Sequence, residues 1–233
     1  MSMLIEAFLR QRLSSPMRIL MALFFFSFPL LFAIFSGSIQ TVANAAGPFA
    51  VLLAAGAIGQ DVSSGVLQLV FARPVTRTEY VLARWLACVS GATLLCAVQL
   101  LLAVLGIVAR GGKVGPLDAI VMLLEDALAA GAIVAIVLML SAMLKGLGDL
   151  ALYLLGLLFA QIVGMVAGAK HWEWLAIAAA EISSSLNPKP DLAWMAGHGE
   201  PSFMGLALVL STIALGLAAA ITLVSRRELS YAD

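Results

Sequence analysis

Six apolar segments separated by polar stretches dominate the chain. They cover roughly residues 19–36, 43–59, 85–109, 119–144, 147–168 and 203–225. Each approaches the length of about 20 apolar residues that a helix needs to cross a bilayer. Because backbone groups inside lipid must find hydrogen-bond partners within the chain, these segments predict helices and exclude open strands. The second segment is the least regular, since Gly47 and Pro48 lie near its start and Gly56 and Gly59 near its end.

Two further segments are amphipathic. Residues 2–15 place apolar side chains on one helical face and polar ones on the other, which predicts a helix in the membrane interface that ends before Pro16. The apolar residues are Leu4, Ile5, Phe8, Leu9 and Leu13, and the polar ones are Glu6, Arg10, Gln11 and Arg12. Within the outer loop of residues 169–202, residues 171–185 combine Trp172 and Trp174 with acidic side chains, and predict a helix that is interfacial or partly inserted.

Composition supports a membrane protein and excludes other classes. Hydrophobic residues make up 63% of the chain and charged residues 11%, against about 25% charged in an ordinary soluble domain. Thirteen basic and thirteen acidic side chains cancel, so the basic excess of a nucleic-acid binder is missing. The predicted fold class is therefore an all-α membrane protein with six transmembrane helices and an N-terminal interfacial helix, and no nucleic acid is expected as a partner.

The basic residues are distributed unequally between the two sides of the membrane that six spans define. Nine fall in residues 1–18, 60–85, 145–149 and 226–233, and four fall in the loops on the other side. Loops rich in Lys and Arg stay in the cytoplasm. A multi-pass protein with both termini in the cytoplasm is therefore predicted.

Little in the sequence indicates metal or redox chemistry. Cys88 and Cys96 are eight residues apart in one apolar segment, so a helix would separate them by about 12 Å, too far for a disulfide. We interpret both as small buried hydrophobic residues. His171 and His198 lie in the outer loop without enough neighbouring ligands, so no metal site is predicted. No catalytic residue is predicted either.

The longest charged interruption is the predicted cytoplasmic loop of residues 60–84. Apolar residues from Leu67 onward recur at helical spacing, which predicts a short amphipathic helix parallel to the membrane. Pro74 disfavours helix at the residue before it. Thr76 or Thr78 can cap the helix that follows. These patterns alone are compatible with a plain amphipathic linker.

The order of residues in this loop is more specific. Asp61, Gly65 and a Leu-Gln-Leu run are followed by Arg-Pro-x-x-Arg-x-x-Tyr at the entry to the next span. This order resembles the permease subunit of ABC-2-type ATP-binding-cassette transporters, in which the loop forms a coupling helix that docks on a separate ATPase subunit. The sequence departs from the family at Val66, where Thr is frequent, and at Asp61, where Glu is common. By position, the resemblance implies an ATPase-coupling role for Asp61, Gly65, Leu67, Gln68, Arg73, Pro74, Arg77 and Tyr80.

The resemblance covers nearly the whole chain. It includes the interfacial helix, the six spans, an outer helical hairpin before the last span and the terminal Arg226-Arg227-Glu228-Leu229. It implies an exporter of a bacterial inner membrane that forms a homodimer and binds two copies of a cytoplasmic ABC ATPase. No Gly-x-x-x-x-Gly-Lys-Ser/Thr phosphate loop occurs in the sequence, so the chain is not expected to be an enzyme. ATP and Mg²⁺ are expected on the partner ATPase, and no cofactor on this chain.

Glu125 and Asp126 stand out near the start of the fourth apolar segment. Ionisable groups at membrane depth are rare and often functional. Either the span begins near Ala127 and leaves both carboxylates at the outer interface, or they line a path for an amphipathic or cationic substrate.

Small residues form a stripe along the fifth span. Gly156, Ala160, Gly164 and Gly168 recur every four residues and so share one helical face, which permits close approach of another helix. The stripe could pack within the chain or against a second copy. The resemblance favours a dimer contact, because permeases of this family pair through their first and fifth spans.

Two other functions are compatible with the sequence. One is a haem-exporter-type permease of cytochrome c maturation, which has a similar length, number of spans and coupling loop. The other is a membrane scaffold or channel that never engages an ATPase. The identity of the substrate is not encoded in any motif of the outer loops.

Overall fold

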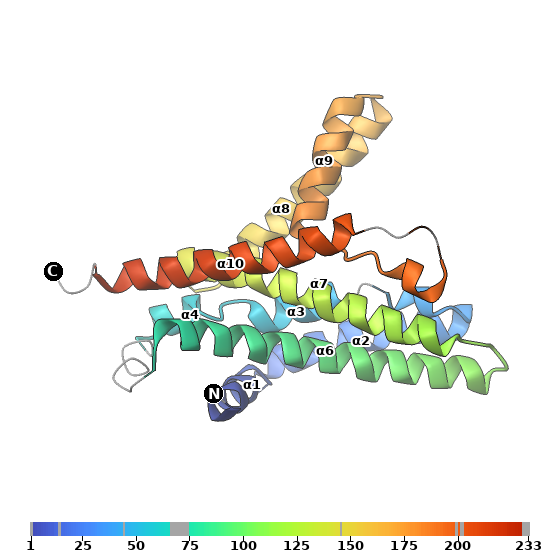
Figure 1. The fold of residues 1–233 in the computed structure, drawn as a ribbon, viewed down its shortest axis with the longest axis horizontal. Coiled ribbons are helices and arrows are strands. Elements are labelled where there is room, and N and C mark those ends of the chain that lie inside the picture. The colour runs from blue at the N-terminus through green and yellow to red at the C-terminus, as the bar shows by residue number, and fades with distance from the viewer. Residues whose placement is uncertain are drawn as a thin grey trace.

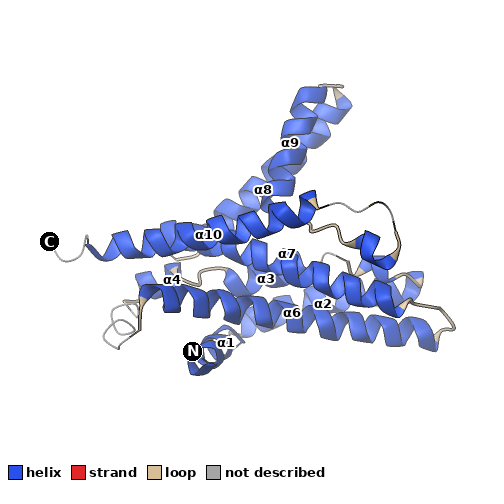
Figure 2. Cartoon of the chain, viewed as in Figure 1, coloured by secondary structure: helices blue, strands red, loops and turns tan. Residues whose placement is uncertain are grey.

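The computed structural model describes residues 2–13, 15–43, 45–65, 75–144, 146–198, 200 and 203–229. Within these residues every regular element is a helix (Figure 2). Six helical segments are long and apolar enough to cross a membrane. The predicted all-α fold with six membrane-spanning segments is therefore confirmed.

The helices follow one another with short connections. The first two are α1 (Ser2–Leu13) and α2 (Pro16–Ser36). The second span contains η1 (Ile39–Thr41), α3 (Ala46–Ala54) and α4 (Gly59–Ser63). The next three spans are α6 (Arg77–Ala109), α7 (Pro116–Met143) and α8 (Gly148–Ala169). The chain continues through α9 (Glu173–Leu186) and η2 (Ala193–Ala196) to the last span, α10 (Met204–Leu229).

Three long helices form the centre of the molecule. α6, α7 and α10 run side by side along its long axis, and α3 packs against α6 and α7 (Figure 1). Ala83 of α6 and Ile133 and Val134 of α7 are fully buried between them. α4, the start of α6, the end of α7 and the start of α8 lie at one end of this bundle, on the left in Figure 1. We call it the Asp61 end, after the buried aspartate of α4.

Pro29 interrupts the hydrogen bonds inside α2. It has no N–H group, so the carbonyl of Phe25, four residues earlier, loses its helical donor. The side-chain amide of Gln99 on α6 donates to this carbonyl at 3.2 Å and to the Phe26 carbonyl at 2.7 Å. Gln99 is fully buried. Gln99 therefore donates to a carbonyl that Pro29 leaves without its helical donor, and so joins α2 to α6.

α6 begins well before residue 85, where the hydropathy pattern places the start of the span. The Thr76 hydroxyl accepts a hydrogen bond from the Glu79 N–H, and the Glu79 carboxylate accepts one from the Thr76 N–H. This reciprocal capping box starts the helix at Arg77. The prediction that Thr76 or Thr78 caps this helix is thus confirmed for Thr76, and Tyr80 and Arg84, which lie within the predicted loop of residues 60–84, stand on the helix. The polar first turns of α6 lower the local hydropathy, which is why the pattern misses them.

The second apolar segment is not one continuous helix. α3 ends at Ala54 and α4 begins at Gly59, after a turn in which Gly56 has a φ of 65°. Glycine adopts this left-handed backbone without the steric cost that a Cβ atom brings. The prediction of a single helix over residues 43–59 is therefore corrected to two helices with a break between them.

α8 and α9 form a hairpin that projects from the side of the bundle (Figure 1). The Tyr153 hydroxyl in the second turn of α8 donates to the carbonyl of Leu186, the last residue of α9, at 3.0 Å. Only residues 170–172 connect the two helices at their other ends. α9 therefore runs back along α8, and the hairpin before the last span is built from the fifth span and α9.

α1 lies against α6, and one of its arginines faces inward. Phe8 and Arg12 expose only 7% and 3% of their surface. They are four residues apart and so share one helical face. Arg10 is exposed and pairs with Glu6 at 2.9 Å. The sequence interpretation placed Arg12 on the polar face with Arg10, and this is wrong, because Arg12 finds buried hydrogen-bond acceptors in the second span.

Candidate functional site

Three side chains from α4 and α6 form a buried charged cluster at the Asp61 end. The Asp61 carboxylate pairs with the Arg84 guanidinium and accepts a hydrogen bond from the Tyr80 hydroxyl at 2.7 Å. Each of the three side chains is almost fully buried, and Asp61 exposes 2% of its surface. Tyr80 and Arg84 are four residues apart, so α6 presents both on one face. Since a buried charge without a partner is costly, the cluster holds α4 against α6.

α1 covers the Arg84 guanidinium from the other side. Arg84 Nη1 donates to the side-chain oxygen of Gln11 at 3.1 Å. The Arg84 guanidinium also lies 3.6 Å from the centre of the Phe8 ring, a cation–π contact. The Phe8 ring meets the Tyr80 ring edge to face at 5.9 Å. α1 is thus bonded to the same cluster that joins α4 to α6.

Arg12 extends this network to the break in the second span. Its Nη1 donates to the carbonyl of Ala55 at 2.9 Å and lies 3.5 Å from the side-chain oxygen of Gln60. Arg18 of α2 donates to the same Gln60 oxygen at 3.2 Å. Burial, and then the nearby charge of Arg84, lower the pKa of Arg12 to about 10. Arg12 therefore keeps its charge at neutral pH.

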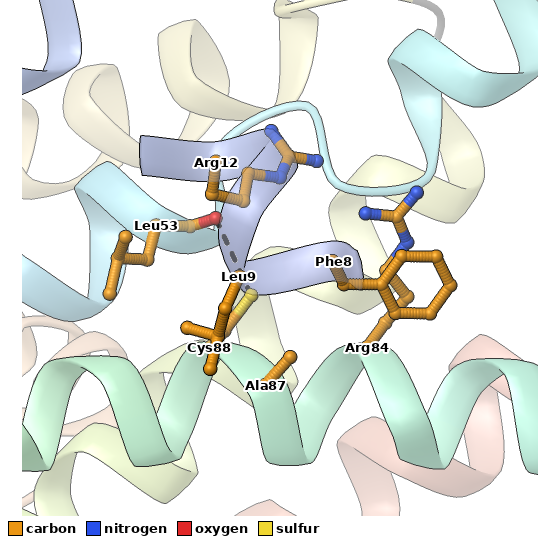
Figure 3. A pocket seen from close by; sticks show the side chains of 7 residues that line it. All are labelled: Phe8, Leu9, Arg12, Leu53, Arg84, Ala87 and Cys88. Carbon is orange, nitrogen blue, oxygen red and sulfur yellow. Dashed lines mark hydrogen bonds between the residues drawn. The ribbon is translucent and has the colours of Figure 1, made fainter. Parts of the chain in front are cut away.

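The space between α1 and α6 is closed. Figure 3 shows Phe8, Leu9 and Arg12 of α1 above α6, with Leu53 of α3 beside them. These residues, together with Arg84, Ala87 and Cys88 of α6, enclose a space that has no room for a water molecule. A packing this tight gives a substrate or ion no room. The residues therefore set the relative positions of the helices.

The residues predicted for ATPase coupling have different positions in the structure. Asp61 and Tyr80 belong to the buried cluster. Gly65 is exposed with a φ of 73°, and Arg77 is half-buried in the first turn of α6. Four further residues lie outside the described residues: Leu67, Gln68, Arg73 and Pro74. The pairing of Asp61 with Arg84 brings the two ends of this segment together.

Sequence reasoning missed Arg84, Ser141 and Asp149 as candidates for this site. Ser141 of α7 and Asp149 of α8 are buried and accept hydrogen bonds from backbone N–H groups in the break of the second span. A signal for Arg84 exists in its spacing of four residues from Tyr80. Asp149 is an acidic residue close to a long apolar run. Nothing in the local sequence distinguishes Ser141 from a serine that bonds to its own helix.

Glu125 and Asp126 lie within α7, which begins at Pro116. Glu125 Oε1 accepts a hydrogen bond from the Leu192 N–H at 2.6 Å, which ties the segment before α10 to α7. Asp126 exposes 5% of its surface. The helix begins at Pro116, and whether its membrane-spanning part begins near Ala127 stays a prediction. A role of either carboxylate in a substrate path stays a prediction.

The stripe of small residues on α8 faces α9 for most of its length. A Cβ atom on Gly156 would lie 3.1 Å from Leu186, and one on Gly164 would lie 3.6 Å from Ala179. Ala160 is buried, whereas a Cβ atom on Gly168 would meet no atom within 4 Å. The stripe thus has a partner within the chain, and the predicted dimer contact through it stays a prediction.

The histidine His198 lies away from this network, and the two cysteines are buried in the core. His198 Nε2 lies 3.1 Å from Asp118 Oδ1, at the exposed start of α7. Cys88 and Cys96 are both buried and free. Among the described residues, no group of three or more His, Cys, Asp or Glu side chains is arranged to hold a metal ion.

Comparison with known protein families agrees with this architecture. The model of the ABC-2 family transporter protein matches residues 8–187, which is more than half of the chain. The matched region includes α2 to α8 and every residue of the buried cluster. No curated protein matches the chain. The chain therefore belongs to the ABC-2 family of transporter proteins, and is a multi-pass membrane permease of an ABC transporter.

Proposed function

We propose that this permease is one half of an exporter, in which two copies of the chain pair and bind two copies of a cytoplasmic ABC ATPase. ATP and Mg²⁺ bind to the ATPase subunits, and residues 60–84 form the coupling segment that docks on them. One observation carries this proposal: the buried contact of Asp61 with Arg84 and Tyr80 closes the base of that segment.

Because its two ends are bonded to each other, the segment can transmit a force to the bundle. Asp61 and Arg84 stand near the two ends of the segment and are bonded to each other, so a force on the segment moves α4 and α6 together. α6 has 33 residues, which corresponds to a length of about 50 Å. A displacement at the Asp61 end therefore reaches the opposite end of the bundle through one helix.

The distribution of charge supports the orientation. The Asp61 end carries Arg12, Arg18 and Arg84, and nine of the thirteen basic residues are assigned to the same side by the sequence. Basic residues accumulate on the cytoplasmic side of membrane proteins. We accordingly place the Asp61 end and both termini in the cytoplasm, and the protein in a bacterial inner membrane.

The exposed surface of two spans supports pairing. In the most apolar stretch of each helix, 6% of the residues are buried in α2 and 17% in α8, against 22% in α10 and 56% in α7. α2 and α8 are the first and fifth spans, through which ABC-2 permeases pair according to the family resemblance. Export as the direction of transport rests on the same resemblance. The two carboxylates Glu125 and Asp126 are the proposed contacts along the substrate path.

A test follows from the charge of the coupling segment. The tagged chain is purified in mild detergent, and the bound ATPase is quantified together with its vanadate-sensitive activity. In the double variant Arg73→Glu with Arg77→Glu, that ATPase activity is expected to fall at least tenfold, because the variant reverses the charge of the docking segment. The matched control, Lys113→Glu with Lys170→Glu, makes the same charge change in loops that the sequence assigns to the other side of the membrane, and should keep this activity. A chain that purifies without any ATPase would support a scaffold or channel instead.

A further inference from the structure

The break in the second span replaces helical hydrogen bonds by bonds to other helices. In a continuous helix, the N–H groups of Gly56, Ile58 and Gly59 would donate to carbonyls four residues earlier. Here the Gly56 N–H donates to Asp149 Oδ2 of α8 at 2.6 Å. The N–H groups of Ile58 and Gly59 both donate to Ser141 Oγ of α7, at 3.0 and 2.9 Å. Two side chains from two other helices therefore take the place of three backbone carbonyls.

The carbonyl groups at the break are satisfied in the same way. In a continuous helix the Ala55 carbonyl would accept a hydrogen bond from the Gly59 N–H. Here it accepts one from the Arg12 guanidinium of α1 at 2.9 Å. The Leu53 carbonyl accepts from the Cys88 thiol of α6 at 3.4 Å, the dashed line in Figure 3. Side chains from α1, α6, α7 and α8 thus surround one interrupted turn.

This arrangement has a clear alternative. Buried backbone groups are nearly always hydrogen-bonded, and here each of these groups has a partner in the broken form and would have another in a continuous helix. Glycines make the broken form accessible. Gly56 has a φ of 65° in the broken form, and Gly59 packs so closely on the α7–α8 connection that a Cβ atom would lie 2.8 Å from the carbonyl oxygens of Leu144 and Gly146. Two packings that satisfy the same groups are the usual basis of a conformational switch.

We propose that residues 55–59 are a joint in the second span, and that Arg12, Cys88, Ser141 and Asp149 are positioning residues that hold the joint in its broken form. When the coupling segment is displaced, the N–H groups of the joint exchange their side-chain acceptors for the carbonyls four residues earlier, and the span becomes continuous. This inference rests on the proposed function for the source of the force, which is the partner ATPase.

The exchange would release several helices at once. Arg12 belongs to α1, Ser141 to α7 and Asp149 to α8, and in the broken form each is tied to the second span through the joint. The Asp61–Arg84 pair lies beyond the joint, so it stays intact while these ties open. One movement of the coupling segment would therefore loosen α1, α7 and α8 without separating α4 from α6.

The thiol of Cys88 provides a direct readout of the joint. In the broken form this thiol donates to the Leu53 carbonyl. In the continuous form the Ala57 N–H donates to the same carbonyl and competes with the thiol, so the hydrogen bond of the thiol weakens. A thiol whose hydrogen bond weakens shows an S–H stretching band at higher frequency. The band is measured by infrared spectroscopy in a Cys96→Ala background and assigned by its loss in Cys88→Ala.

The experiment compares the full chain with and without its ATPase. In the purified complex, ATP with vanadate is expected to move the Cys88 band to higher frequency. Gly56→Ala is expected to move it without nucleotide, because alanine resists the left-handed φ and favours a continuous helix. Ser141→Ala with Asp149→Asn is expected to act in the same direction by a different route. The matched control Gln99→Met, which removes a buried hydrogen bond between other helices, should leave the band in place.

The possible outcomes separate the two proposals. A band that stays in place in Gly56→Ala and in the Ser141/Asp149 double variant overturns the joint. A band that responds to these variants but not to ATP and vanadate, in a complex that hydrolyses ATP, overturns the link between joint and ATPase and leaves the partnership standing. If no ATPase binds the chain, the proposed function and the driven exchange both fail, and the variants still decide whether the joint has two states.

Discussion

The Asp61 end of the bundle and the α8–α9 hairpin join helices by opposite means. At the Asp61 end, charged and polar side chains of α1, α4 and α6 bond to one another in a closed interior. In the hairpin, Gly156, Ala160 and Gly164 bring α9 close to α8, and Tyr153 adds a single hydrogen bond to the carbonyl of Leu186. The first junction depends on particular hydrogen-bond and ion-pair partners, and the second on the small volume of the side chains between the helices.

This difference predicts different responses to mutation. A directional, charged junction fails when one partner is removed, because the remaining charge stays buried. A junction of small residues tolerates many changes and fails when a larger side chain separates the helices. The Asp61 end is therefore suited to transmit a defined movement, and the hairpin to maintain a contact surface.

The largest effect is expected from breaking the buried ion pair. Arg84→Met leaves Asp61 buried without its charged partner, and should lower the free energy of unfolding by about 3–5 kcal/mol. Unfolding is followed by SDS titration of the protein in mixed micelles. The double variant Arg84→Met with Asp61→Leu should recover most of the loss, since no lone charge remains. A single variant as stable as the wild type would contradict the role given to the cluster.

A smaller effect is expected from overfilling the hairpin. Gly164→Leu forces its side chain toward Ala179 and should cost about 1–3 kcal/mol of stability in the same titration. Gly168→Leu is the matched control, because a Cβ atom there meets nothing within 4 Å. Cross-linking of the two variants separates the two uses of the stripe. Loss of the cross-linked dimer in Gly168→Leu alone would assign the open end of the stripe to the dimer.

The smallest effect is expected from a neutral hydrogen bond between helices. Gln99→Leu removes the donor to the Phe25 and Phe26 carbonyls, and should cost about 0.6 kcal/mol and at most about 1.7 kcal/mol, the mean and the maximum measured for such bonds in a membrane protein. Gln161→Leu, the same change at an exposed position of α8, is the control and should be neutral. If Gln99→Leu costs as much as Arg84→Met, charge is not what distinguishes the Asp61 end.

The candidate site could be predicted from the sequence only in part. Asp61 and Tyr80 were selected because their order around an Arg-Pro motif resembles the coupling segment of ABC-2 permeases. Their burial against Arg84 was not predicted, because the hydropathy pattern placed the start of the third span after Arg84. Arg12 was assigned to the polar face of α1, since its spacing from Phe8 has meaning only once a partner for the guanidinium is known.

Local chemistry along the chain is enough to predict the six spans, the N-terminal helix and the unequal distribution of basic residues. Each of these follows from hydropathy, helical spacing or charge within a short window, and needs no knowledge of distant residues. The burial of Arg12 and Arg84, the break at Gly56 and the partner of the α8 stripe are known only from the folded chain. They depend on hydrogen-bond partners and neighbouring helices far away in sequence, such as Asp149 for Gly56, and no local window contains both members of such a pair.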